Sequence, residues 1–271
     1  MIISIDDPAD PRLDEYCLLN DQVARRAREG EEFFIAEGYV SIDRVVDSGH
    51  ELRSVLVTPS RVERITARVP GLADGPIPLY VMTRDLMADA VGFDLHRGVV
   101  ASATRRPKLS VAELAASGST RLAVLHGLND AENVGVIARA ARALGIDGVV
   151  LGPTCTDAYS RRTVRVSMGE VLHLPVARAA AWPGDLDLLH ASGFETWAMT
   201  PAPDAIDLWS VAPNDLPARL AVVLGAEGPG LDRETLGACS RRVRIPIDAA
   251  VDSLNVGHAA AITFAALGRP R

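Results

Sequence analysis

Two continuous apolar runs constrain the fold of this chain more than any other feature. Residues 121–128 read RLAVLHGL and residues 220–227 read LAVVLGAE, and apolar and polar positions do not alternate within either run. Strands with one face in water alternate, whereas strands covered by helices on both faces read as near-continuous apolar segments. The runs therefore predict parallel strands between two layers of helices, an α/β architecture.

Predicted strands and helices alternate on both sides of a polar stretch at residues 105–118. This stretch contains a proline and a short helical pattern, and its composition is typical of a connecting segment. We therefore predict a smaller α/β domain over residues 1–108, a linker over 109–118 and a larger α/β domain over 119–271. With 271 residues, the chain is long enough for two hydrophobic cores.

Composition excludes several classes of protein. Hydrophobic residues make up 48% of the chain and charged residues 23%, which excludes general disorder. No run of apolar residues is long enough to span a membrane, and the acidic N-terminal segment does not look like a signal peptide. The three cysteines lie far apart without a C-x-x-C pair, so we expect a cytoplasmic protein that binds no metal.

The net charge of −7 argues against indiscriminate binding to nucleic acid. It does not exclude RNA, because Lys108 is the only lysine and arginine supplies the other basic residues. The guanidinium group matches phosphate oxygens bidentately, so a few clusters suffice to dock a folded RNA. A compositional bias explains the same excess of arginine equally well.

Three segments of the larger domain depart from what packing alone demands. In the first, a strand ends at residues 126–128, a polar loop follows, and a helix opens with Asn133. Arg139 and Arg142 lie one turn apart on that helix. Taken alone, this segment also fits an asparagine cap and two solvated arginines.

The second segment, residues 222–232, places Glu227 among three glycines that let the backbone bend sharply and approach a ligand. It matches neither a dinucleotide fingerprint nor a P-loop, and a simple glycine turn explains it equally well. In the third, residues 244–267, a strand ends at Ile245 and a helix of small residues follows. Ser253 fits the N-cap of that helix, and Ala259–Ala261 allow a second helix to approach, for example one from a second subunit.

Together and in this order, the segments resemble the three motifs of the SpoU (TrmH-like) branch of the SPOUT methyltransferases. The family pattern N-x-G-x-x-x-R matches residues 133–139, G-x-E-x-x-G-L matches 225–231, and I-P followed by S-L-N-V matches 245–246 and 253–256. Each motif alone is a weak signal, whereas all three in order are specific. Ile247 and Gly257 depart from the Met and Ser that are frequent in the family.

The resemblance implies both a fold and a reaction. It implies a deep trefoil knot in the larger domain, a homodimer, and a small N-terminal RNA substrate-binding domain similar to kink-turn-binding ribosomal proteins. The implied reaction transfers a methyl group from S-adenosylmethionine to a ribose 2′-hydroxyl of tRNA or rRNA. The implied catalytic residues are Arg139, Asn133, Glu227, Ser253 and Asn255. The implied cofactor-binding residues are Thr200, Leu224, Gly225, Ala226, Ile245 and Leu254.

Arg139 has two possible roles in such a reaction. As a general base it would have to be neutral, and a neutral arginine at pH 7 costs about 8 kcal/mol relative to its ordinary pKa. A charged Arg139 that grips a phosphate and stabilises the developing alkoxide costs less.

Two basic groups are candidate RNA-binding residues: Arg161, Arg162 and Arg165 in the larger domain, and His96 with Arg97 in the smaller one. A solvated surface explains the arginines equally well, and a structural role explains His96. We expect His126 and His258 to pack or to cap.

Two alternatives remain open from the sequence. One is a catalytically silent RNA-binding protein of the same fold, and the other is an rRNA methylase that confers antibiotic resistance. The intact set of motif residues weighs against the first alternative.

Overall fold

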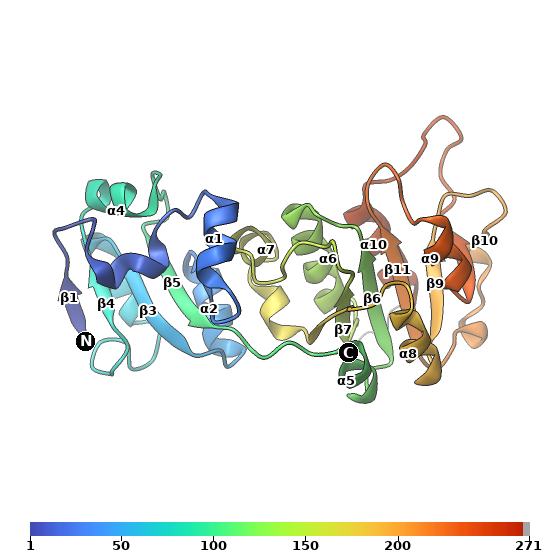
Figure 1. Cartoon of the computed structure of the whole chain (residues 1–271), viewed down its shortest axis with the longest axis horizontal. Helices are drawn as coiled ribbons and strands as arrows, with labels where there is room; N and C mark the ends of the chain where they lie inside the picture. The colour runs from blue at the N-terminus through green and yellow to red at the C-terminus, as the bar shows by residue number, and fades with distance from the viewer. Residues whose placement is uncertain (268–271) are drawn as a thin grey trace. The chain divides into compact units, whose positions relative to one another are not determined.

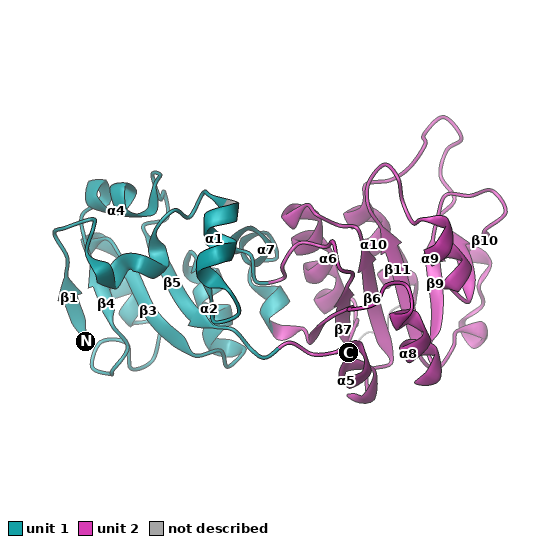
Figure 2. Ribbon diagram, viewed as in Figure 1, with its two compact units in different colours: residues 1–107, 159–172 teal, residues 108–158, 173–271 magenta. Residues whose placement is uncertain are grey.

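The computed structural model describes residues 1–267, apart from the side chain of Gln22. Residues 268–271, the end of the predicted domain 119–271, lie outside the described residues. The chain forms two compact units (Figure 2): unit 1 comprises Met1–Pro107 and Tyr159–Leu172, and unit 2 comprises Lys108–Ala158 and His173–Arg271. The predicted functional bounds, 1–108, 109–118 and 119–271, stay predictions.

Unit 1 contains a mixed five-stranded sheet in the order β1-β4-β3-β5-β2 (Figure 1). Its strands are β1 (Ile2–Ser4), β2 (Phe33–Glu37), β3 (Leu52–Val57), β4 (Leu79–Val81) and β5 (Val99–Thr104). Its helices are α1 (Gln22–Glu29), α2 (Tyr39–Asp47), α3 (Val62–Thr66), α4 (Arg84–Val91) and α7 (Arg161–Val166). Because β5 runs antiparallel to both β2 and β3, this unit is α/β with a mixed sheet.

Unit 2 contains a seven-stranded sheet in the order β10-β12-β9-β11-β6-β7-β8, in which every pair is parallel. Its strands are β6 (Arg121–His126), β7 (Gly148–Leu151), β8 (Val176–Arg178), β9 (Glu195–Met199), β10 (Ile206–Asp207), β11 (Leu220–Gly225) and β12 (Arg241–Arg244). Its helices are α5 (Val111–Ala116), α6 (Ala131–Ala143), α8 (Asp185–Ala191), α9 (Arg233–Ala238) and α10 (Val256–Leu267). Short 3-10 helices lie at Pro11–Tyr16, Pro59–Arg61, Glu170–His173, Leu208–Ser210 and Pro213–Asp215.

The two apolar runs form adjacent central strands of this sheet. β6 and β11 pair in register from Arg121 opposite Leu220 to His126 opposite Gly225. Residues 122–125 and 220–224 are all buried, so both faces of the two strands are covered. The prediction of parallel strands between helical layers is therefore confirmed.

The polar stretch at residues 105–118 contains α5, which begins at a capping box. Ser110 accepts a hydrogen bond from the backbone N–H of Glu113, and the Glu113 carboxylate accepts one from the backbone N–H of Ser110. Leu114 and Ala115 of this helix are buried in the core of unit 2. Among the helices of residues 1–267, none has the length and apolar content that crossing a bilayer requires.

Candidate active site

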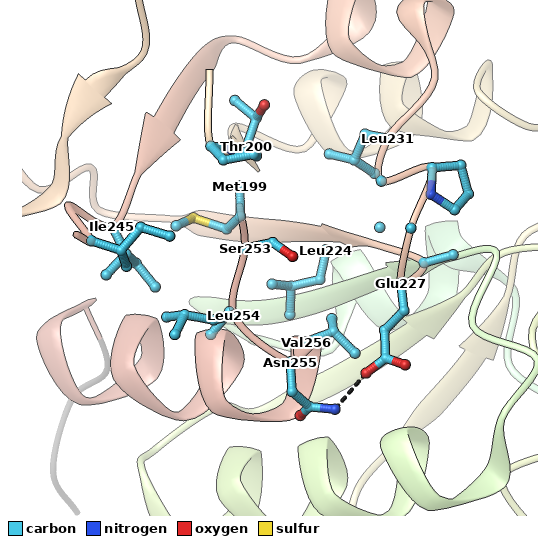
Figure 3. A pocket seen from close by; sticks show the side chains of 18 residues that line it. Met199, Thr200, Leu224, Glu227, Leu231, Ile245, Ser253, Leu254, Asn255 and Val256 are labelled. Atoms are coloured by element: carbon cyan, nitrogen blue, oxygen red, sulfur yellow. Dashed lines mark hydrogen bonds between the residues drawn. The ribbon is translucent and has the colours of Figure 1, made fainter. Parts of the chain in front are cut away.

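A cavity of about 530 Å³ opens in unit 2, where three parallel strands end (Figure 3). Because β9, β11 and β12 run in the same direction, their carboxyl ends meet at one edge of the sheet, where parallel α/β sheets bind ligands. The lining residues are 199–201 at the end of β9, 224–231 at the end of β11, and 245, 247, 253–256 and 259 after β12. The volume is in the range of small-molecule sites.

The loop after β11 folds back over its own strand, and Gly225 makes this possible. A Cβ atom at Gly225 would lie 2.4 Å from the carbonyl carbon of Gly230 and 2.6 Å from the nitrogen of Leu231. The loop closes with a hydrogen bond from the Gly230 N–H to the Ala226 carbonyl, 3.0 Å long. Only glycine permits so close an approach of two backbone segments, which explains the first glycine of the G-x-E-x-x-G motif.

Asn255 caps helix α10 at the edge of the cavity. Its Oδ1 accepts hydrogen bonds from the backbone N–H groups of Gly257 at 2.9 Å and of His258 at 3.3 Å. The alternative that Ser253 is the cap is therefore wrong. Ser253 instead lines the cavity, where Figure 3 shows it between Ile245 on one side and Glu227 on the other.

The other half of the same amide joins the three motifs. Asn255 Nδ2 donates a hydrogen bond to Glu227 Oε1, which Figure 3 shows. It also donates to Asn133 Oδ1, at 3.2 Å. Because the Asn133 oxygen accepts this bond, the Nδ2 group of Asn133 remains as a hydrogen-bond donor. One asparagine thus begins a helix and also fixes the orientation of a carboxylate and a second amide.

Two predicted catalytic residues do not line the cavity: Asn133, which is joined to it through Asn255, and Arg139, which no hydrogen bond of the described residues joins to it. The Arg139 side chain is exposed on α6 and is not among the lining residues. Arg139 follows Asn133 by six positions, so the two side chains point about 120°, a third of a turn, apart around the helix axis. Within residues 1–267, no hydrogen bond or ion pair engages the Arg139 side chain.

All six predicted cofactor-binding residues line the cavity: Thr200, Leu224, Gly225, Ala226, Ile245 and Leu254. The sequence interpretation missed Met199, Pro201, Leu231, Ile247, Val256 and Ala259, which also line it. Met199 and Pro201 could have been predicted from the sequence, since both lie at the end of a predicted parallel strand, where ligand sites form.

The predicted RNA-docking arginines lie in unit 1, and Arg161 is directed inward. Its guanidinium pairs with the buried carboxylate of Glu37, donates to Asn20 Oδ1 at 3.1 Å and lies 5.0 Å from the ring centroid of Phe93. Burial lowers the pKa of Arg161, against the opposing effect of Glu37. Arg165 lies 3.7 Å from the same carboxylate.

Arg162, His96 and Arg97 are the exposed members of the two predicted RNA-binding groups. The His96 side chain is 85% exposed and lies 3.5 Å from Asp94. Arg97 covers Gly38 closely, since a Cβ atom there would lie 2.7 Å from its Nη1. These three side chains are accessible to a ligand of unit 1.

A parallel sheet whose carboxyl edge opens into a cavity formed by three separate loops defines unit 2 as an α/β ligand-binding domain. The sequence model of the SpoU rRNA Methylase family matches residues 121–265, more than half of the chain. The chain belongs to this family, and the resemblance noted from its three motifs is confirmed.

Similar proteins cover nearly the whole chain. An uncharacterized tRNA/rRNA methyltransferase of Mycobacterium bovis is 43% identical over 260 residues, 95% of this chain and 88% of the relative. The structure of an AdoMet-bound rRNA methyltransferase from Sinorhizobium meliloti matches 98% of this chain and 97% of its own, with a TM-score of 0.79 and 25% identity. An RNA 2′-O ribose methyltransferase structure matches 98% of both chains, with a TM-score of 0.74 and 25% identity.

Proposed function

We propose that this protein transfers a methyl group from S-adenosylmethionine to a ribose 2′-hydroxyl of tRNA or rRNA. The observation that carries the proposal is the hydrogen-bonded group of Asn133, Glu227 and Asn255 at the rim of the cavity. Three separate motifs contribute one polar side chain each to this group. The similarity to an RNA 2′-O ribose methyltransferase supports the choice of acceptor.

The cavity suits S-adenosylmethionine in size and chemistry. Leu224, Ile245 and Leu254 offer apolar side chains to an adenine ring, and the backbone at Gly225 and Ala226 offers hydrogen-bonding groups. Thr200 would add a hydroxyl. The AdoMet-bound relative from Sinorhizobium meliloti supports this assignment. When bound, the cofactor would supply an electrophilic methyl group.

The chain's own residues would align the acceptor and stabilise the charge that develops on its oxygen as the proton leaves to solvent. Methyl transfer requires an in-line approach of the hydroxyl oxygen and removal of its hydrogen. The free Nδ2 of Asn133 and the hydroxyl of Ser253 would hold the ribose. Glu227, whose oxygen accepts from Asn255, would keep both amides in place. Arg139 would act as a cation that grips a phosphate and stabilises the alkoxide as it forms.

We further propose a homodimer and a trefoil knot in unit 2, both as the family implies. In such a homodimer both subunits would contribute to each site, and Arg139 of one subunit would reach the cavity of the other. Val136, one turn before Arg139 on α6, is an exposed large hydrophobic residue with 41% of its surface accessible. A contact between two copies through α6 would cover it.

RNA would dock on the predicted substrate-binding domain, residues 1–108, and on α7, while the rest of residues 119–271 would carry out catalysis. His96, Arg97 and Arg162 would contact phosphates. Arg161 and Arg165 would chiefly hold α7 in place through Glu37. Reversing the charge of Arg97 and Arg162 should weaken RNA binding and reduce its salt dependence by about one counterion per residue. An unchanged salt slope would remove these residues from the interface.

Arg139→Ala is the test of the mechanism. It should lower methyl transfer at least about a hundredfold, as expected when a group that stabilises transition-state charge is lost, and leave S-adenosylmethionine affinity unchanged in calorimetry. Arg233→Ala, which removes an exposed arginine on α9, is the matched control and should retain full activity. Wild-type turnover by Arg139→Ala would refute the role of Arg139. A wild-type protein without affinity for S-adenosylmethionine would instead favour the silent RNA-binding protein.

A further inference from the structure

A cluster of side chains behind the cavity fixes the point where the loop at residues 226–231 rejoins the fold. His126 ends β6 and lies opposite Gly225 of β11. Its Nε2 lies 3.1 Å from Oδ2 of Asp232, the residue that follows the loop and caps α9. A hydrogen bond from the Thr235 N–H lowers the pKa of the Asp232 carboxyl. An ionised carboxylate only accepts, so His126 Nε2 is the donor.

Trp182 closes this cluster into a ring of contacts. The imidazole of His126 stacks on the Trp182 ring, with centroids 4.9 Å apart and planes 10° apart. The indole N–H donates to Thr235 Oγ1 at 2.9 Å, and the Thr235 backbone N–H donates to Asp232 Oδ1 at 2.7 Å. The four residues therefore hold the start of α9 against the end of β6.

None of these four side chains lines the cavity, whereas residues 226–231 supply six consecutive lining residues. The loop starts from β11 and is held near its start, where Glu227 accepts a hydrogen bond from Asn255. Its end is fixed by the bond between Asp232 and His126. The cluster therefore acts on the cavity through the loop alone.

The histidine at position 126 has a role that packing alone does not explain. Its Nδ1 is buried and, among residues 1–267, has no hydrogen-bond partner. A buried polar atom without a partner opposes folding, so an apolar side chain would pack better here. The hydrogen bond from Nε2 to Asp232 is what an apolar side chain cannot provide.

We propose that His126 is a positioning residue for cofactor binding, which holds the 226–231 loop in its binding conformation through Asp232 and Trp182. This role rests on the proposed cofactor. A loop already held in place loses less conformational freedom when a ligand binds, so its anchor contributes to affinity without touching the ligand. Removing the anchor raises the cost of ordering the loop and leaves the reacting groups unchanged.

His126→Ala in the full-length protein tests this role. We expect the Kd for S-adenosylmethionine, measured by calorimetry, to rise about tenfold, while kcat at saturating cofactor stays within about twofold. Hydrogen–deuterium exchange of residues 226–231 should become faster in the absence of cofactor. His126→Gln keeps a donor near the position of Nε2 and should restore most of the affinity. If the alanine variant fails to fold, His126→Leu keeps the buried volume and carries the same expectations.

His190→Ala is the matched control, because His190 is another partly buried histidine of unit 2. It is 31% exposed and bonds Thr196 Oγ1 at 2.8 Å, away from the loop. It should leave the Kd and the loop exchange unchanged. Wild-type affinity and loop exchange in His126→Ala, or equal losses in both histidine variants, would overturn the role of His126. If the wild-type protein itself binds no S-adenosylmethionine, the proposed cofactor fails, and loop exchange in the cofactor-free protein still decides whether His126 positions the loop.

Discussion

The methyl group that alanine would add at Gly225 meets the backbone of the cavity's own loop. Its Cβ would lie 2.4 Å from the Gly230 carbonyl carbon, whereas ordinary contacts begin at 3.4 Å, so the loop must move by about 1 Å. Overpacking of this kind costs about 1–3 kcal/mol. A gap of that size along the cavity wall removes up to about half of the dispersion energy of each contact it opens. We therefore expect Gly225→Ala to bind S-adenosylmethionine at least about tenfold more weakly.

Calorimetry with S-adenosylmethionine and thermal unfolding of the same samples measure the two effects. Gly237→Ala is the matched control, because Gly237 lies inside α9 and a Cβ there would meet no atom within 4 Å. Replacing a helical glycine by alanine stabilises by about 0.5–1 kcal/mol, so this variant should melt slightly higher and bind normally. Wild-type affinity and stability in Gly225→Ala would refute the steric reasoning.

Variants at three further residues test single contacts. Asn255→Ala removes the cap of α10 and should cost about 1 kcal/mol in the free energy of unfolding. Asn255→Asp keeps the cap oxygen but loses the donor to Glu227, so its stability should stay closer to that of the wild type. Both variants should lose activity in methyl transfer assays. Asp232→Asn should melt below wild type at neutral pH. Because the folded-state pKa of the Asp232 carboxyl is lowered, its stabilisation is present above the usual carboxyl range and is lost as the pH falls through the folded pKa, so melting curves should converge in acid. Arg161→Ala leaves the buried Glu37 carboxylate without its nearest cation and should cost about 3 kcal/mol in urea unfolding. Equal stability of Arg161→Ala and wild type would show that Arg165 compensates fully.

The central strands β6 and β11 of unit 2 could be predicted from the sequence, whereas the short edge strands β1 of unit 1 and β10 of unit 2 could not. β6 and β11 carry continuous apolar runs, and burial on both faces requires such runs. β1 and β10 have only three and two residues, and each is defined by pairing with a strand far along the chain. So short a segment carries no periodic pattern of its own. Sequence patterns also did not assign residues 159–172 to the compact unit that contains β2, because that assignment depends on contacts with residues far away along the chain.

The lining of the candidate site could be predicted to a large extent, because the motifs lie where parallel strands end. The assignment of the helix cap could not, since Ser253 and Asn255 are both favoured caps and only the backbone decides between them. That Arg139 and Asn133 point in different directions could be predicted from helix geometry. Side chains six positions apart on an α-helix point about 120° away from each other, so the first motif by itself predicts that its asparagine and its arginine face different surfaces.

Two loops around the cavity are each fixed by hydrogen bonds within the chain. The loop after β11 is held at its end by His126, and the loop after β12 is held where Asn255 caps α10. The bond between Asn255 and Glu227 then couples the two loops, so a disturbance at either anchor propagates to the other. Ordering both loops during folding, before any ligand arrives, lowers the entropy cost of binding. It follows that variants at the two anchors should be non-additive: the double variant His126→Ala with Asn255→Ala should lose less affinity than the product of the single losses.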